Sequence, residues 1–135
     1  MRQRARLFAW GAAAALALAA AGAAAYAHSR HNDAQRKAAL LTGGDPTLAP
    51  ALLRAYGCTS CHHVPGVQAP GGLVGQPLRG LKQRLYVGGV LTHTPENLVR
   101  WIVNPKAFSP NTAMQVTGIS EPEARHVAAY LYARE

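Results

Sequence analysis

The segment Cys58-Thr59-Ser60-Cys61-His62 constrains this chain more than any other part of its sequence. Two thiols separated by two residues can each add to one vinyl group of a haem, and a histidine directly after the second thiol then lies under the iron as its proximal ligand. These are the chain's only two cysteines. The motif therefore predicts one haem c, bound covalently by Cys58 and Cys61, with His62 as an iron ligand.

Cys-x-x-Cys pairs also occur in zinc sites and in thioredoxin-like redox proteins. A zinc site needs more ligands, and although His62 and His63 adjoin the pair, no second Cys-x-x-Cys or His-x-x-x-His follows. A thioredoxin-like domain needs βαβ patterning around the motif, and none is visible. A disulfide between Cys58 and Cys61 would close too small a loop to add much stability. Covalent haem attachment is therefore the favoured interpretation.

Residues 1–27 have the features of an export segment. Arginines at positions 2, 4 and 6 precede the uncharged run 7–27, which is long enough to cross the hydrocarbon core of a membrane. The arginines are expected to stay in the cytoplasm, so the rest of the chain is exported. The expected location of the haem domain is therefore the periplasmic side of the cytoplasmic membrane.

Two interpretations of residues 1–27 compete. The run is rich in alanine and ends in Ala25-Tyr26-Ala27, which resembles a signal-peptidase site. Trp10 and Tyr26, near its two ends, instead suit the two membrane interfaces. The aromatic residues favour an uncleaved anchor slightly, and a cleaved signal peptide would give a soluble periplasmic protein.

Residues 28–45 are polar and contain few large apolar side chains, which predicts a flexible linker. His28 and His31 in this segment are interpreted as solvated side chains rather than metal ligands. A chain of 135 residues then leaves one small folded domain, residues 46–135.

Three helical patterns appear in this domain, and no strand pattern of any length competes with them. Asp45-Pro46 predicts the start of the first helix and Gly57 its end, directly before the haem motif. Thr94-Pro95 starts the second, and Asn104-Pro105 stops it. The capping box Ser120-Glu121-Pro122-Glu123 starts the third. The fold class predicted is all-α.

Residues 64–92 are rich in glycine and proline, which predicts a long loop. A loop of this length in a small domain argues against a packed core, unless a bound group supplies the apolar surface. We expect the haem to form much of the core.

Asn104-Pro105-Lys106-Ala107-Phe108-Ser109-Pro110-Asn111-Thr112-Ala113-Met114 follows the second helix. Together with the haem motif, this segment resembles the Asn-Pro-Lys loop and the methionine ligand of class I cytochromes c, and residues 116–119 and 129–131 are similar to that family's closing helix. The resemblance covers residues 46–135. It implies a small cytochrome c fold wrapped around the haem, with Met114 as the second axial ligand.

The same resemblance implies roles at the haem for further residues. Pro110 and Thr112 would shape the methionine loop and face the haem edge. Trp101 would lie against the methionine side of the haem, and Arg84 would face a propionate. Lys106 matches a lysine at the exposed haem edge.

Two positions depart from the family pattern. Gln76 stands where the family usually has a proline whose carbonyl accepts a hydrogen bond from the ligand histidine; any residue offers that carbonyl, so only stiffness is affected. Gln115 stands where related bacterial proteins often have a proline after the methionine, which predicts a less rigid loop. His63 and His93 could in principle bind iron, but surface histidines are the favoured interpretation. His126, beside the apolar face of the last helix, is expected to reach solvent.

The formal net charge is +8, but much of it lies in the export segment and in the linker. Nucleic acid is therefore not expected as a partner, despite the basic composition. A modest positive face near Arg79, Lys82, Arg84 and Lys106 is expected to steer the domain toward an acidic redox partner.

The resemblance implies electron transfer rather than enzymatic activity. The expected donor is a quinol-oxidising complex, and the expected acceptor is a terminal oxidase of a respiratory chain. Two alternatives stay open: a haem enzyme or sensor with an open sixth position that binds a small molecule, and a haem subunit built permanently into an oxidase complex.

Overall fold

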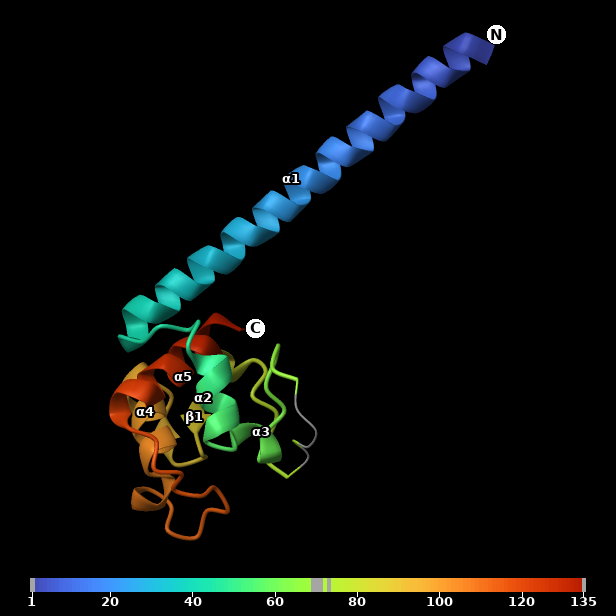
Figure 1. The fold of residues 1–135 in the computed structure, drawn as a ribbon. Coiled ribbons are helices and arrows are strands. Elements are labelled where there is room, and N and C mark those ends of the chain that lie inside the picture. Colours follow the sequence, from blue (N-terminus) through green and yellow to red (C-terminus); the bar gives the residue numbers. More distant parts are fainter. Residues whose placement is uncertain (1, 69–71, 73, 135) are drawn as a thin grey trace. The chain divides into compact units, whose positions relative to one another are not determined.

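The computed structural model describes residues 2–68, 72 and 74–134, and for residues 2–9 the backbone alone. The protein is mostly helical (Figure 1), as the sequence predicts. It divides into two compact units, Met1–Asp33 and Ala34–Glu135.

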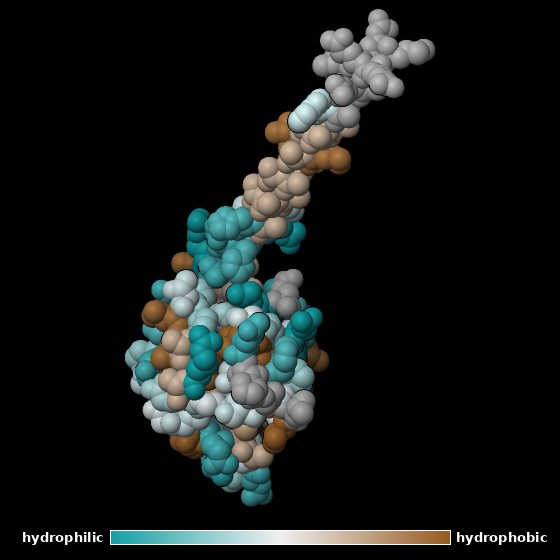
Figure 2. Space-filling model, turned by 45° about the vertical axis from the view of Figure 1, so that its right-hand side comes forward, coloured by the Kyte–Doolittle hydropathy of each residue, from teal (hydrophilic) through white to brown (hydrophobic). Residues whose placement is uncertain are grey.

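The first unit consists of the N-terminal part of α1 (Arg2–Thr42). Its large apolar side chains are exposed, among them Trp10, Leu18 and Tyr26, and Figure 2 shows the apolar run of this helix in tan and brown. Among the described residues, Trp10–Thr42 is long and apolar enough to cross a membrane. This finding agrees with an N-terminal anchor or a signal sequence, and does not separate the two.

The end of α1 differs from the flexible linker predicted for residues 28–45. The helix continues to Thr42 because residues 34–41 consist mainly of strong helix formers, and because Ala38 and Thr42 are buried. Gly43 ends the helix with φ of 69°, and its N–H donates to the carbonyl of Ala39 at 2.8 Å.

The second unit contains the remaining elements. In chain order these are α2 (Ala49–Ala55), α3 (Cys58–Cys61), η1 (Leu81–Gln83), β1 (Tyr86–Val87), β2 (Leu91–Thr92), α4 (Pro95–Val103), η2 (Pro105–Ala107) and α5 (Glu121–Ala133). The two short strands form an antiparallel hairpin in which Tyr86 pairs with Thr92 and Val87 with Leu91.

The core of this unit surrounds α5. This helix contacts both α2 and α4, and Figure 1 shows it crossing between them. The largest of the core side chains that these helices contribute are Leu53, Leu98, Trp101, Ile102, Tyr130 and Leu131. The helix packing leaves the haem motif and the loops around it at the margin of the core.

The predicted helix starts are partly confirmed. Thr94 caps α4 by accepting a hydrogen bond from the N–H of Asn97, and Ser120 forms the expected capping box with Glu123. The predicted start at Asp45-Pro46 is wrong, since α2 begins at Ala49. The Asp45 carboxylate instead accepts from the N–H and hydroxyl of Thr47, at 2.8 and 2.7 Å, in a local turn that competes with helix capping.

Candidate functional site

The two cysteines of the motif lie on a single helical turn, α3. Gly57 adopts the left-handed conformation, with φ of 68°, and this lets the chain leave α2 and start a new turn at Cys58. Residues three apart lie on one face of a helical turn, so Cys58 and Cys61 present their thiols on the same side. Both are free cysteines, the first half-buried and the second exposed. Burial raises the pKa of the Cys58 thiol.

His62 leaves this turn in an extended conformation, and its ring is held by a backbone carbonyl. Its Nδ1 lies 2.7 Å from the carbonyl oxygen of Gln76. A carbonyl can only accept, so Nδ1 carries a proton, and in the neutral imidazole Nε2 then keeps a free electron pair. This is the contact that the cytochrome resemblance predicts for Gln76. A second hydrogen bond of this kind orients most metal-binding histidines.

Glycines bring the loop that contains Gln76 close to the motif. The N–H of Gly75 donates to the carbonyl of Cys61 at 2.8 Å, and that of Gly72 to the carbonyl of Ser60 at 3.3 Å. A Cβ on Gly75 would lie 2.5 Å from the ring of His62, which is closer than atoms can approach. Position 75 therefore has no room for a side chain while His62 keeps this position.

Arg84 follows the same loop in the sequence and donates hydrogen bonds back to it. Its guanidinium donates to the side-chain oxygen of Gln76 at 3.1 Å, to the carbonyl of Pro77, and to that of Arg79 at 3.4 Å. Arg84 thus braces the residue whose carbonyl holds His62. Its predicted contact with a haem propionate stays a prediction.

Met114 is half-buried and packs against the core. The indole N–H of Trp101 donates to its sulfur at 3.1 Å, and the backbone N–H of Met114 donates to the hydroxyl of Thr112 at 3.3 Å. A thioether sulfur has two electron pairs, so one remains for a metal. Pro110, the other predicted loop residue, is exposed.

Trp101 is itself held from behind by the β1–β2 turn. A Cβ on Gly88 would lie 2.2 Å from the indole ring. Trp101 is 8% exposed. The structure therefore brings Trp101 and Met114 together, and the place of Trp101 beside a haem stays a prediction.

His93 differs from the surface side chain predicted for it, because both of its ring nitrogens are buried without a hydrogen-bond partner in the described part of the chain. His126 is partly exposed and accepts a hydrogen bond on Nδ1 from the N–H of Asp45 at 2.7 Å. Each depends on contacts between distant segments, which the sequence around it does not reveal.

Tyr56 is a further residue that the sequence does not single out. Its hydroxyl donates to the Glu123 carboxylate at 2.9 Å, which raises the pKa of Tyr56. Tyr56 ends α2 directly before the haem motif, and Glu123 lies in the first turn of α5. The only sign of this contact in the sequence is that Tyr56 is the last apolar position of the first predicted helix.

The donor atoms present fit a haem better than a bare metal ion. Within residues 2–68, 72 and 74–134, no group of three or more His, Cys, Asp or Glu side chains is placed to hold a metal ion. The chain instead offers two thiols on one face, a histidine with its Nε2 left free, and a thioether. These are the groups that covalent haem attachment and axial ligation use.

Comparisons of the chain with protein-family models, with curated proteins and with solved structures found no match.

Proposed function

We propose that residues 46–135 form a class I cytochrome c domain that binds one haem c and transfers single electrons between redox proteins. The observation that supports this most directly is the 2.7 Å contact between His62 Nδ1 and the Gln76 carbonyl, next to two thiols on one helical turn. A solvated histidine after a Cys-x-x-Cys pair has no need of such a contact.

The chain's own residues have separable tasks in this proposal. Cys58 and Cys61 would hold the haem through their thiols, and His62 would bind it through Nε2 while its Nδ1–H donates to the Gln76 carbonyl. Met114 would offer its thioether sulfur as the second protein ligand. When bound, the haem would supply one-electron chemistry.

Trp101 tunes the methionine. Its N–H withdraws electron density from the sulfur, which weakens the sulfur as a donor. When the sulfur donates less, ferric iron loses more stabilisation than ferrous iron does. The hydrogen bond from Trp101 therefore raises the reduction potential.

The domain works on the periplasmic side of the cytoplasmic membrane, with residues 1–27 as an uncleaved anchor. The long apolar α1 supports this proposal. Mass spectrometry of the mature protein tests it: an intact N-terminal segment is expected, and a new N-terminus at His28 would mean a soluble periplasmic protein.

The proposed partners are a quinol-oxidising complex as donor and a terminal oxidase as acceptor. Lys106 and Arg79 are both exposed and offer positive charge to an acidic partner. Reversal of charge in Lys106→Glu is expected to slow electron delivery at low salt and to leave the absorption spectrum unchanged. Equal rates for variant and wild type across a salt series would show that docking lies elsewhere.

The test of covalent attachment is expression of the full chain in a host that matures c-type cytochromes, followed by acid-acetone extraction. The haem is expected to stay with the denatured protein. In Cys58→Ala and Cys61→Ala each thioether is lost singly, and in the double variant the haem is expected to extract freely. Haem that extracts freely from the wild type would contradict the proposal.

Carbon monoxide distinguishes electron transfer from the alternative of a haem enzyme or sensor. With Met114 on the iron, the reduced wild-type protein is expected not to bind carbon monoxide, whereas Met114→Ala is expected to bind it. Rapid binding by the wild type would indicate an open sixth position and small-molecule chemistry.

A further inference from the structure

The turn of the β1–β2 hairpin is made of two glycines, Gly88 and Gly89. Both have positive φ, of 57° and 77°, which is the backbone conformation that tight two-residue hairpin turns require. The N–H of Val90 donates to the carbonyl of Val87 at 3.1 Å and closes the turn. Both glycines are exposed, so backbone conformation and exposure are alike at the two positions.

The two glycines differ in what lies next to them. A Cβ on Gly88 would lie 2.2, 2.4 and 2.5 Å from three carbons in the six-membered ring of the Trp101 indole, whereas a Cβ on Gly89 would meet nothing within 4 Å. The backbone of Gly88 therefore packs directly against the indole. A turn of this type accounts for a glycine at either position, but it does not account for this contact.

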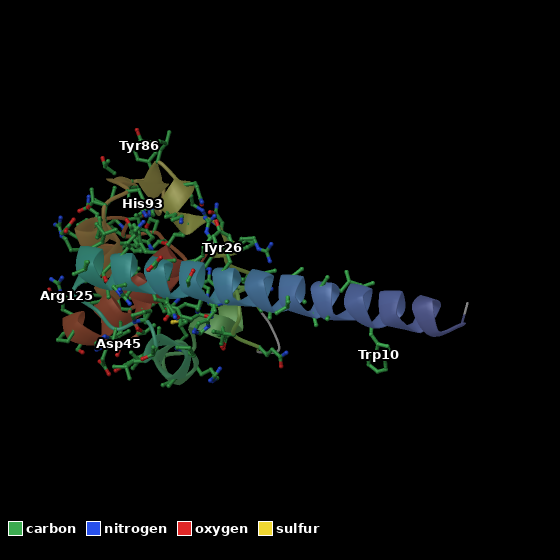
Figure 3. All side chains as sticks on the ribbon, turned by 90° about the horizontal axis from the view of Figure 1, so that it is seen from above. Trp10, Tyr26, Asp45, Tyr86, His93 and Arg125 are labelled. Carbon is green, nitrogen blue, oxygen red and sulfur yellow. The ribbon has the colours of Figure 1, made fainter. Side chains whose placement is uncertain are left out.

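The hairpin is attached to the helix that carries Trp101. Val87 is buried in the core, whereas Tyr86 beside it is exposed and points outward from the hairpin (Figure 3). Asn97, in the first turn of α4, donates through its side-chain amide to the carbonyl of Thr92 at 2.9 Å. The turn therefore cannot move away from the indole unless these contacts break.

The five-membered ring of the same indole carries the N–H that donates to the Met114 sulfur at 3.1 Å. Trp101 is buried among core side chains, and protein cores are packed too closely for a ring to move without consequence. Hydrogen bonds also weaken as their length and angle depart from the optimum. A side chain at position 88 would therefore act on the N–H···S contact through the indole.

We propose that Gly88 is a positioning residue, whose lack of a side chain keeps the Trp101 N–H on the Met114 sulfur, and that the β1–β2 turn in this way raises the reduction potential of the protein. The inference rests on the proposed function, since it needs Met114 as a ligand of the haem. It adds that an exposed turn, distant in the sequence from both Cys58-Thr59-Ser60-Cys61-His62 and Met114, contributes to the electron-transfer properties.

The first test is a redox titration of the full-length holoprotein in detergent. Gly88→Ala is expected to lower the potential toward that of Trp101→Phe, because its Cβ displaces the indole. Gly89→Ala is the matched control, since it brings the same methyl group and the same strain of positive φ but no clash, and it should keep the wild-type potential. Equal shifts in the two variants would overturn the inference, because strain in the turn would then explain both.

The second test repeats Gly88→Ala in the Trp101→Phe background. Phenylalanine lacks the outer ring of the indole, so a Cβ at position 88 has room there, and no N–H remains to be displaced. Gly88→Ala is therefore expected to shift the potential in the wild-type background only, which is the coupling that a double-mutant cycle measures. The same shift in both backgrounds would mean that Gly88 does not act through Trp101.

Asn97→Ala tests the same idea without adding atoms to a packed site, and it decides the question if Gly88→Ala does not yield holoprotein. Removal of the side-chain amide frees the hairpin from α4, so the indole is held less firmly and the potential should fall by less than in Trp101→Phe. In the Trp101→Phe background Asn97→Ala should have no effect on the potential.

Proton NMR of the reduced, diamagnetic holoprotein gives a readout that does not depend on the potential. The chain has two tryptophans, and the indole N–H signal of Trp101 is the one missing from Trp101→Phe. This signal is expected to shift and to exchange faster in Gly88→Ala but not in Gly89→Ala. An unchanged potential in the Gly88 and Asn97 variants, with the haem attached and Met114 still bound, would overturn this inference and leave the proposed function standing. Failure of the wild type to attach haem would overturn both.

Discussion

The loop that holds His62 and the loop that carries Met114 are fixed to the domain in different ways. Gly72 and Gly75 each donate a backbone hydrogen bond to the haem motif, Leu78 donates one to His63 directly after it, and Arg84 braces the same loop. Met114 has the Thr112 hydroxyl and the Trp101 indole, and residues 115–118 are all exposed.

This difference would matter for the proposed holoprotein. The histidine side is held by backbone contacts and by a glycine with no room for a side chain, so its geometry is set by contacts within the chain. The methionine side depends on two side-chain contacts and, in the proposed holoprotein, on the iron itself. Damage to the first side should prevent haem attachment, whereas damage to the second should change the properties of a haem that is still attached.

The largest effect is expected from Gly75→Ala. The φ of Gly75 is outside the left-handed region, so the substitution acts through the clash of its Cβ with the His62 ring, 2.5 Å away. The loop must move or the ring must turn, and most of the holoprotein should be lost. The yield of covalently bound haem per chain measures this. Gly22→Ala, where a Cβ meets nothing within 4 Å, is the control, and equal yields for the two would contradict a preorganised histidine side.

A smaller effect is expected from Met114→Leu. Leucine preserves the packing volume but removes the sulfur, so haem attachment through Cys58 and Cys61 should continue and the sixth position should open. Reduced protein should then bind carbon monoxide, and the potential should fall because a thioether favours ferrous iron. If the variant loses its haem as completely as Gly75→Ala does, the two sides are not as different as their contacts indicate.

Features set by neighbouring residues could be predicted from the sequence, and features set by distant ones could not. The caps at Thr94 and Ser120 are local, and both are present. The sequence predicts a linker where residues 28–42 are helical, because the last turn of this helix is stabilised by a distant residue. Arg125 on α5 donates to the carbonyl of Thr42 at 3.0 Å. The contact between the Gln76 carbonyl and His62 could be predicted only from the family resemblance. The burial of the His93 ring nitrogens depends on contacts between segments far apart in the sequence, so the sequence around His93 does not reveal it.

Trp101→Phe should act more weakly than Met114→Leu. The ring remains in place beneath Gly88 and the N–H to the Met114 sulfur is removed. A hydrogen bond with a net effect of about 1 kcal/mol corresponds to about 40 mV for one electron, so the potential should fall by up to this amount. Trp10→Phe, at a side chain that is 74% exposed on α1, is the matched control and should leave the potential unchanged.

The smallest effect concerns the link between the two sides. Glu123 accepts from Ser120, which follows the methionine loop, and from Tyr56, which precedes the haem motif. These bonds, with Ser120 contributing most, lower the pKa of Glu123 below its ordinary 4.5. Because the folded pKa is the lower one, this stabilisation is complete above the unfolded value and is lost as pH falls through the folded value.

Glu123→Gln should therefore be slightly less stable than the wild type at neutral pH, and the two should converge in acid. Thermal unfolding from neutral pH to about pH 3 measures this, across the range where carboxyl groups titrate. Glu121→Gln, which removes an exposed ion pair with Arg125, should show little change at any pH. A constant difference between Glu123→Gln and wild type at all pH values would mean that the carboxylate charge is unimportant.

Near-infrared magnetic circular dichroism of the oxidised full-length protein tests the central claim most directly, because it identifies the two axial ligands of a haem iron. The wild type is expected to show the charge-transfer band of a low-spin ferric haem with one histidine and one methionine ligand, and Met114→Leu is expected to lack it. A band characteristic of two histidines, or a high-spin spectrum, in the wild type would contradict the assignment of His62 and Met114.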